Sequence, residues 1–304
     1  MPGNDWDPAT LRARISDPAH RLRHPGGSPD PVEIAAYAAG IPAEAEGTAL
    51  VLGMTPELRA LAATRFGRLV SVEANPAAIA LYRDWLDPEA RARETIVERD
   101  WLAGERLSDD PVAVVLGDGV FGNLPDLAAH RRLLRVIGAS LAPQGRFITR
   151  MVMIPNGFDP AAYACDRLIA RYRAGEYDAA EFGFGMRIVG HYATCYDPTT
   201  ATLDNARLFA ACAERRAAGG LTAEEYAAIQ RYYFGGKNCI VTQAAWESAL
   251  AACGFRFRQH RCRGKAWYDY YVVYECAPGF PSPPSPGAGA NEEPRKGSAR
   301  ESLH

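Results

Sequence analysis

Two segments of the sequence have residue types and a spacing that would suit a nucleotide-like cofactor. An apolar run at 49–52 ends on Gly53, and a second apolar run at 69–72 ends on Glu73. A glycine at the end of a strand permits a tight turn and lets the backbone come close to a ligand. The two carboxylate oxygens of Glu73 could accept hydrogen bonds from both hydroxyls of a ribose. The pair therefore predicts that an adenosine-like group is held between two parallel strands.

The same two residues would also be present if Gly53 only formed a turn and Glu73 were a solvated strand-end acid, with no ligand bound to either. The choice of cofactor is narrowed by the next residues. A dinucleotide site would require Gly-x-Gly-x-x-Gly, and the segment 53–58 has only the first of these glycines. The single glycine disfavours a pyrophosphate group, and with it an NAD(P)-dependent reductase, which would have a similar sheet.

From residue 48 onward, apolar strands alternate with helical patterns, which is typical of a parallel sheet with crossover helices. The first five strands are expected at 49–52, 69–72, 95–98, 112–116 and 146–152. Helices are expected between them at 56–65, 76–85 and 127–141. A helix at 242–253 and strands at 255–262 and 268–276 would complete the sheet.

The expected fold is α/β: a doubly wound, mostly parallel seven-stranded sheet with a helical N-terminal arm and a helical cap inserted after the fifth strand. The arm is expected to contain helices at 8–15 and 31–39. The tail is rich in Pro, Gly, Ser and Glu, a composition that cannot bury a core, so we expect it to be disordered. The predicted parts are the arm at 1–45, the cofactor-binding core at 46–153, the Tyr- and Phe-rich cap at 154–238, the last sheet elements at 239–276 and the tail at 277–304.

Composition limits the partners of the chain. It has 304 residues, 48% of them apolar, and a net charge of −2 with only short basic pairs, so we expect no nucleic-acid partner. No apolar run approaches the roughly 18 residues that would span a bilayer, so no membrane partner is expected. The seven cysteines are dispersed without Cys-x-x-Cys pairs, which favours reduced thiols in a cytoplasmic protein. No metal site is evident, and a homodimer remains open.

Five segments, in order, resemble the motifs of class I S-adenosylmethionine-dependent methyltransferases. Residues 50–58 look like the first motif in a variant with one glycine, and 72–76 resembles the ribose-binding second motif. Residues 98–102 look like the segment whose acid accepts from the adenine amine. Residues 116–124 are similar to the fourth motif, and 141–147 to the loop before the fifth strand. The resemblance covers about residues 48–153, with a weaker echo at 239–276.

The resemblance implies S-adenosylmethionine as cofactor, with S-adenosylhomocysteine or methylthioadenosine as product. The residues that match its cofactor-binding positions are Gly53, Met54, Thr55, Glu73, Ala74, Asp100, Trp101, Gly117, Asp118 and Gly119. The first motif lacks its later glycines, so an arginine or residues of the arm would contact the methionine carboxylate. Two alternatives stay open: Asp118 could stabilise a turn, and Trp101 could be an ordinary core aromatic residue.

The acceptor is expected under the arm and the cap. The candidate catalytic residues are Asp118, Asn123, His191, Tyr192 and Tyr233. Asn123 could instead cap the helix that starts near residue 125. His191 could remove a proton from the acceptor, although a lone histidine is more often structural.

Two further segments near the expected acceptor site have open roles. Arg150 could clamp an acceptor carboxylate or form a salt bridge. Lys237 and Asn238 could simply lie in a turn.

The expected function is methyl transfer to a small-molecule acceptor, in the manner of secondary-metabolite enzymes. One alternative is a methyltransferase-like enzyme that cyclises S-adenosylmethionine and releases methylthioadenosine, of the azetidine-2-carboxylate synthase type. A lesser alternative is a non-catalytic protein that binds S-adenosylmethionine. The choice between these reactions depends on the tyrosine-rich cap at 154–238, and the sequence does not decide it.

Overall fold

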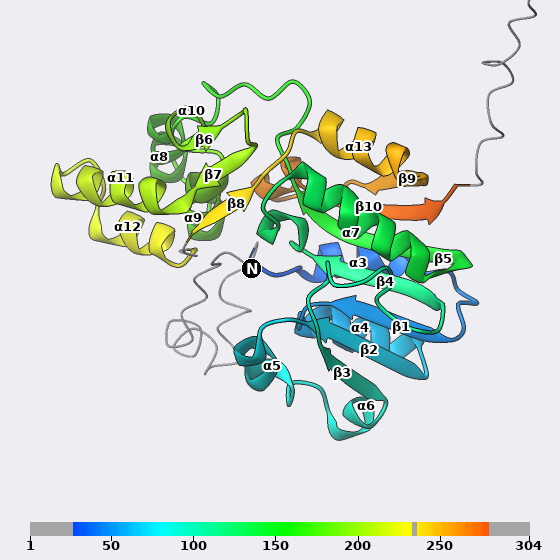
Figure 1. Cartoon of the computed structure of the whole chain (residues 1–304). Coiled ribbons are helices and arrows are strands. Elements are labelled where there is room, and N and C mark those ends of the chain that lie inside the picture. Colours follow the sequence, from blue (N-terminus) through cyan, green and yellow to red (C-terminus); the bar gives the residue numbers. More distant parts are fainter. Residues whose placement is uncertain (1–26, 233–235, 280–304) are drawn as a thin grey trace, which may run out of the picture.

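The computed structural model describes residues 27–232 and 236–279 (Figure 1). The helix expected at 8–15, the candidate Tyr233 and the tail after Gly279 lie outside the described residues.

The core of the molecule is one seven-stranded sheet. Its strands are β1 (Thr48–Leu52), β2 (Arg68–Glu73), β3 (Glu94–Glu98), β4 (Val112–Asp118), β5 (Leu141–Val152), β9 (Phe255–His260) and β10 (Tyr271–Pro278). Their spatial order is β3-β2-β1-β4-β5-β10-β9 (Figure 1). The first five strands are parallel, and β10 runs antiparallel to both β5 and β9. The predicted seven-stranded, mostly parallel sheet is confirmed.

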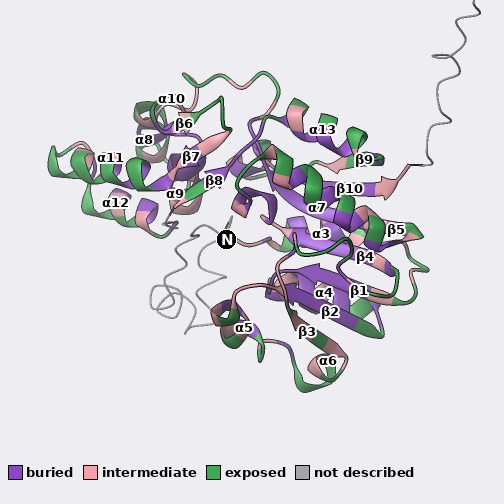
Figure 2. Cartoon of the chain, viewed as in Figure 1, coloured by how far each residue is buried: buried purple, intermediate pink, exposed green. Residues whose placement is uncertain are grey.

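Helices cover both faces of the sheet. Those of the core are α3 (Pro31–Gly40), α4 (Pro56–Arg65), α5 (Pro76–Tyr82), α6 (Pro88–Ala92), α7 (Leu127–Ser140) and α13 (Gln243–Ala252). One buried cluster joins α3 and α4 to the sheet, and another joins α7 and α13 to its opposite face (Figure 2). Pro31, Pro56, Pro76 and Pro88 each begin a helix, where proline loses no intrahelical hydrogen bond.

The cap between β5 and α13 has its own buried core, rich in aromatic side chains. Its elements are α8 (Cys165–Arg173), α9 (Ala179–Ile188), α10 (Tyr192–Cys195), β6 (Tyr196–Asp197), β7 (Thr202–Asp204), α11 (Asn205–Ala217), α12 (Ala223–Gln230) and β8 (Lys237–Cys239). The three strands form a small antiparallel sheet that the sequence analysis did not predict. Strands of two or three residues are too short to show an alternating pattern. The expectation that Lys237 and Asn238 lie in a turn is wrong, because they belong to β8.

Two other local expectations need correction. Asn123 does not cap a helix: it lies in the 3₁₀ turn η1 (Phe121–Asn123), and α7 is capped by Asp126, whose Oδ1 accepts from the Ala129 N–H at 2.8 Å. The strand expected at 268–276 begins as a second 3₁₀ turn, η2 (Ala266–Asp269), and becomes extended only at Tyr271. Both differences arise where a short turn precedes a regular element.

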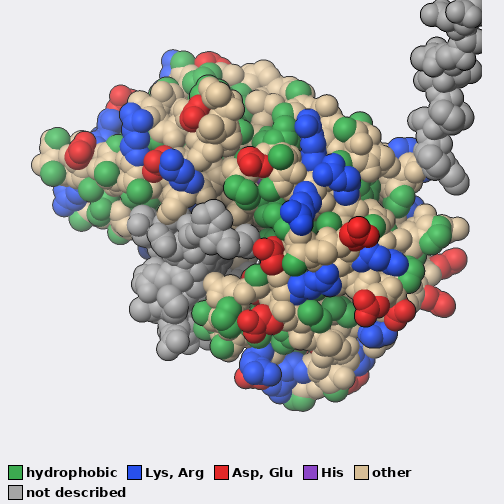
Figure 3. Space-filling view, viewed as in Figure 1, with side chains coloured by type: hydrophobic (Ala, Val, Ile, Leu, Met, Phe, Trp, Pro, Cys, Tyr) green, Lys and Arg blue, Asp and Glu red, His purple; other side chains and the backbone are tan. Residues whose placement is uncertain are grey.

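None of the described helices is long and apolar enough to cross a membrane. On the face of the described molecule seen in Figure 3, basic and acidic side chains are interspersed over the core elements.

Candidate functional site

Gly53 and Glu73 leave the sheet side by side. Leu52 of β1 pairs with Val72 of β2, so the next residue of each strand lies at the same carboxyl edge. Gly53 has φ +86°, and its N–H donates to the Val72 carbonyl at 2.8 Å. A Cβ placed on Gly53 would lie 3.7 Å from Oε2 of Glu73. The backbone of Gly53 and the carboxylate of Glu73 therefore face one another, as the sequence predicted.

The Glu73 carboxylate is fixed by the loop that follows it. Its Oε1 accepts from the Asn75 N–H at 2.8 Å, and Asn75 in turn caps α5 by accepting from the Ala77 N–H at 2.9 Å. Burial raises the pKa of Glu73, and backbone hydrogen bonds from Asn75 and Ala74 oppose that rise. The arrangement leaves Oε2 on the side of Gly53.

Trp101 lies over the ends of β1 and β2. Its indole N–H donates to the Val72 carbonyl at 2.7 Å, and its Cζ2 lies 3.8 Å from the position that a Cβ on Gly53 would occupy. The side chain is also buried in the core cluster, so the structure shows Trp101 as a core aromatic residue, and its contact with an adenine stays a prediction. Asp100 is half-buried, and its Oδ1 accepts from the Leu102 N–H at 2.9 Å. This turn places Trp101 at the edge.

Two other candidates of the first motif have local roles. The Met54 side chain is buried against Tyr82 of α5, so only its backbone belongs to the turn at the sheet edge. Thr55 is the N-cap residue of α4, but its side chain makes no capping hydrogen bond.

Asp118 and Arg150 form a buried ion pair at the same edge of the sheet. They are register partners on the parallel strands β4 and β5, so their side chains lie on the same face. Nε of Arg150 donates to Oδ1 of Asp118 at 2.7 Å and Nη2 donates to Oδ2 at 3.3 Å. Of the two roles that the sequence left open for Arg150, the structure shows the salt bridge.

The arm supplies a second carboxylate to Arg150. Nη1 of Arg150 donates to Oε2 of Glu33 at 2.8 Å, and both side chains are almost completely buried. Asp30 and Glu33 form a capping box at the start of α3, which holds the Glu33 carboxylate in place. Burial raises the pKa of Glu33, and the charge of Arg150 opposes that rise. The ion pair of Asp118 and Arg150 is thus part of a triad that ties the arm to the sheet.

Tyr37 of α3 bridges β4 and β5 next to this triad. Its hydroxyl donates to the Gly117 carbonyl at 2.6 Å and accepts from the Arg150 N–H at 2.6 Å. Gly119 has φ +62°, and its N–H donates to the Arg150 carbonyl at 3.2 Å. Burial raises the pKa of Tyr37 well above its ordinary value, so the hydroxyl keeps its proton.

A buried asparagine joins the cap to the loop after β4. Nδ2 of Asn238 donates to the Gly122 carbonyl at 3.0 Å, and Oδ1 accepts from Arg187 Nη2 at 2.9 Å and Asn205 Nδ2 at 2.8 Å. Asn123, in the same loop, donates from Nδ2 to the Gly119 carbonyl at 3.3 Å. The cap arginine Arg187 is thereby fixed beside the segment that carries Asp118 and Asn123.

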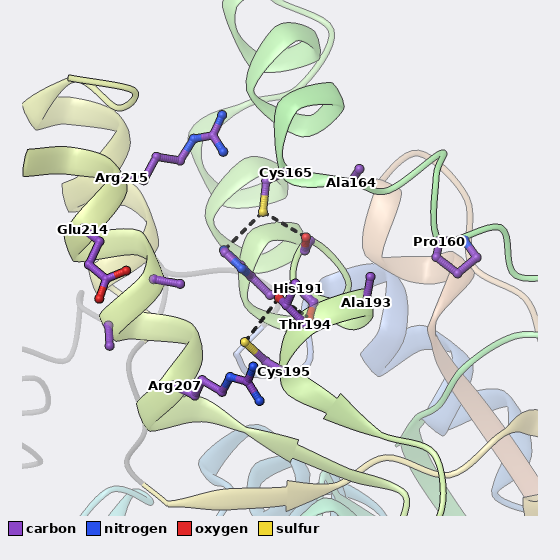
Figure 4. Close-up of a pocket in the computed structure, with 13 residues that line it drawn as sticks. Pro160, Ala164, Cys165, His191, Ala193, Thr194, Cys195, Arg207, Glu214 and Arg215 are labelled. Atoms are coloured by element: carbon purple, nitrogen blue, oxygen red, sulfur yellow. Dashed lines mark hydrogen bonds between the residues drawn. The ribbon is translucent and has the colours of Figure 1, made fainter. Parts of the chain in front are cut away.

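His191 lies elsewhere, in a hollow of the cap with a volume of about 600 Å³ (Figure 4). Its Nε2 is 3.2 Å from Sγ of Cys165 on α8 and 3.3 Å from Sγ of Cys212 on α11. Burial lowers the pKa of His191 to about 4, and raises the pKa of Cys165 to about 11 and of Cys212 to about 12. These groups are therefore uncharged near neutral pH, and His191 is a weak base there.

Tyr192 follows His191 into the cap. Its ring stacks on Tyr196 at 4.5 Å and meets Phe158 edge-on at 4.9 Å. The expectation that His191 and Tyr192 lie with Asp118 is therefore not met, because both pack against side chains of the cap itself. Tyr233 is outside the described residues.

Three residues that surround Arg150 were not predicted from the sequence: Glu33, Tyr37 and Tyr271. The Arg150 guanidinium lies 4.7 Å from the ring centroid of Tyr271. One of the three had a readable signal, because Asp30-Pro31-Val32-Glu33 is the sequence of a capping box. Tyr37 and Tyr271 had none, since their partners are far away in the chain.

No protein-family model matches the sequence, and no curated protein matches it significantly. Solved structures do match the fold. The DhpI–SAH complex is 13% identical, the match covers 91% of this chain and 97% of that chain, and the TM-score is 0.52. The CcbJ methyltransferase from Streptomyces caelestis is 13% identical, with 83% and 91% covered and a TM-score of 0.53. The chain therefore has the fold of the class I methyltransferases, which confirms the resemblance at the level of the fold.

Proposed function

We propose that this chain, with its class I methyltransferase fold, is an S-adenosylmethionine-dependent methyltransferase of a small-molecule acceptor. The observation that carries the proposal is the pair formed by Gly53 and Glu73, where a side-chain-free backbone position lies beside a half-buried strand-end carboxylate. This pair offers two acceptor oxygens and close backbone approach, which are what an adenosine ribose requires. Fold similarity alone would not distinguish function, so the site carries the argument.

The residues at the edge fit the cofactor. The Glu73 carboxylate would hold the ribose hydroxyls, and Trp101, next to Gly53, would flank the adenosine. The methionine end would lie towards Gly117–Gly119 and Asp118, at the ends of the adjoining strand. When bound, S-adenosylmethionine supplies a methyl group made electrophilic by the positive charge of its sulfur. Two solved structures of the same fold, one named as an SAH complex and the other as a methyltransferase, are consistent with this cofactor.

The chain's own contribution to methyl transfer is alignment. An in-line displacement gains most when the two reactants are held at near-attack distance in a site from which water is excluded. The arm is tied to the sheet edge through Glu33 and Tyr37, and the cap through Asn238. These buried hydrogen bonds hold the arm against β5 and the cap against the loop after β4, next to the strand that ends at Asp118.

Calorimetric titration with S-adenosylhomocysteine tests the proposal, with NAD⁺ as the matched dinucleotide control. We expect saturable binding of S-adenosylhomocysteine and none of NAD⁺, since the chain lacks the pyrophosphate turn. Absence of S-adenosylhomocysteine binding would refute the cofactor and the function together.

A second incubation, with S-adenosylmethionine and no acceptor, separates methyl transfer from cyclisation. A methyltransferase leaves the cofactor intact under these conditions. Release of methylthioadenosine would instead identify the chain as an enzyme that cyclises S-adenosylmethionine, with its aromatic cap enclosing the cofactor alone.

A further inference from the structure

We infer that Asn238 is a positioning residue of the proposed reaction, and that it couples the cap to the loop that follows Asp118. The inference rests on the proposed function. It adds a route by which binding of the cofactor and ordering of the cap strengthen each other.

Asn238 lies at the boundary between the cap and the core. It is the middle residue of β8, on the core side of the cap, where it pairs with Leu203 of β7 (Figure 1). Its side chain leaves the small sheet and donates from Nδ2 to the Gly122 carbonyl at 3.0 Å. The loop packs closely there, since a Cβ placed on Gly122 would lie 3.9 Å from the Cys239 carbonyl oxygen. The cap is thus bonded directly to the turn after β4.

The contacts of Asn238 require an amide. Its Oδ1 faces two donors, Nη2 of Arg187 at 2.9 Å and Nδ2 of Asn205 at 2.8 Å, whereas its Nδ2 faces a carbonyl. Turning the amide over would place its NH₂ group against two donors and its oxygen against the carbonyl, so the orientation is fixed. The three side chains are buried, where a lost hydrogen bond is costly. The bond to Gly122 is therefore held from within the cap.

A short path leads from Gly122 to Asp118. Asn123 follows Gly122 in the same 3₁₀ turn, and its Nδ2 donates to the Gly119 carbonyl at 3.3 Å. Gly119 comes directly after Asp118, the last residue of β4. The segment 117–119, where we place the methionine end of the cofactor, is therefore joined to Asn238 through two side-chain hydrogen bonds.

The cap can open separately from the sheet. Most of its buried side chains belong to a cluster distinct from the two that cover the faces of the sheet. A segment with its own core opens locally while the remainder stays folded. Displacement of β8 breaks the bond between Asn238 and Gly122 and so releases the loop. A cofactor that binds the ordered loop therefore stabilises the cap, and by linkage the ordered cap favours cofactor binding to the same extent.

This coupling would order the events of methyl transfer. The transfer needs both reactants aligned at once, and the acceptor is expected under the cap. The bound cofactor orders the loop after β4, and the loop, through Asn238, holds the cap in place. The wall of the acceptor site is then complete only when the methyl donor is present.

Hydrogen exchange of the full chain, with and without S-adenosylhomocysteine, measures the coupling. The reporters are the amides of α11 and the Ile240 N–H, which donates to the Ala201 carbonyl at 2.7 Å. With the ligand at about 100 times its Kd, exchange in the cap of the wild type should slow by about tenfold or more, towards a limit of about 100-fold for complete coupling. Unchanged exchange in the cap of a protein that binds the ligand would overturn the inference.

Asn238→Asp tests the residue. Aspartate keeps the acceptor for Arg187 and Asn205 and removes the donor to Gly122. S-adenosylhomocysteine should then slow exchange in the cap by less than about twofold, and its affinity should fall about two- to tenfold because the loop loses one hydrogen bond. Asn238→Ala, which buries no new charge, is the second variant and should lose the same protection. Full protection of the cap in either variant contradicts the assignment.

Asn205→Ala is the matched control. It removes one hydrogen bond inside the cap and leaves the bond from Asn238 to Gly122. Its cap should still be protected by the ligand, with an affinity within about twofold of the wild type. An equal loss of protection in Asn205→Ala and Asn238→Asp would reduce Asn238 to a structural residue. If the wild type binds S-adenosylhomocysteine without protecting the cap, only this inference fails. If it does not bind S-adenosylhomocysteine, the proposed function fails with it.

Discussion

The hydroxyl of Tyr37 takes the place of a direct backbone hydrogen bond between β4 and β5 beside Arg150. It accepts from the Arg150 N–H on β5 and donates to the Gly117 carbonyl on β4, both at 2.6 Å. A helix of the arm is thereby inserted into the hydrogen bonding of the sheet, at the edge where the cofactor is proposed to bind. The same arginine carries the ion pairs to Glu33 and Asp118, so backbone and side chain of Arg150 both connect to the arm.

Tyr37→Phe should destabilise the protein by about 1–3 kcal/mol, because a buried carbonyl and a buried N–H both lose their partner. Chemical denaturation monitored by tryptophan fluorescence measures the change. Tyr270→Phe serves as control, since in the described structure that hydroxyl has no hydrogen bond to lose. Equal stabilities of the two variants would show that β4 and β5 form their hydrogen bonds directly with each other when the Tyr37 hydroxyl is absent.

Arg150→Met should be more damaging, by about 3–5 kcal/mol, because it leaves two buried carboxylates without their shared cation. The comparison is Arg258→Met, which removes an ion pair to Glu275 from a side chain that is 65% exposed. That change should cost no more than about 1 kcal/mol. If both variants unfold at the same denaturant concentration, the buried triad does not stabilise the arm.

Glu73→Ala should weaken S-adenosylhomocysteine binding by about 1–3 kcal/mol, since the ribose hydroxyls lose a charged acceptor. Glu98→Ala is the matched control. Glu98 ends the neighbouring strand β3 as the register partner of Glu73, but its side chain is exposed. Calorimetry should show an unchanged affinity for Glu98→Ala. A similar loss in both variants would indicate a general charge effect, and no loss in Glu73→Ala would remove the ribose role.

The stability of the protein should fall as pH drops from about 6.5 to about 4, and His130 is one cause. Burial lowers the pKa of His130 from its ordinary value of 6.5 to about 4, against a hydrogen bond to the Phe121 carbonyl that acts in the opposite direction. Between these two values the unfolded chain binds the proton and the folded chain does not. The stabilisation is therefore complete above pH 6.5 and is lost as pH falls through 4.

His130 should contribute about 3 kcal/mol to this loss. His130→Gln should make the dependence of unfolding free energy on pH shallower in this window, although His191, which has a similarly lowered pKa, will still contribute. Denaturant titrations at a series of pH values measure the slopes. An identical slope in the variant would mean that His130 titrates normally in the folded protein.

Local signals predicted most of the sheet. The start of α4 at Pro56, its end at Arg65 and the strand ends at Leu52 and Glu98 match the expected positions, because apolar periodicity and helix-start prolines act over a few residues. The cap was predicted less well. Strands β6, β7 and β8 exist only because the cap folds back on itself, and no short stretch of sequence carries that information.

By itself, the sequence determined that Gly53 and Glu73 stand at the ends of adjacent strands, since strand alternation and a parallel connection suffice to place them there. Only the tertiary structure decided what surrounds Arg150. Its partner Glu33 is 117 residues away in sequence and Tyr37 is 113 residues away. The tertiary structure also shows that His191 packs against two cysteines of the cap and does not lie at the sheet edge. Periodicity fixes where a side chain leaves the backbone, whereas the packing of distant elements fixes what it meets.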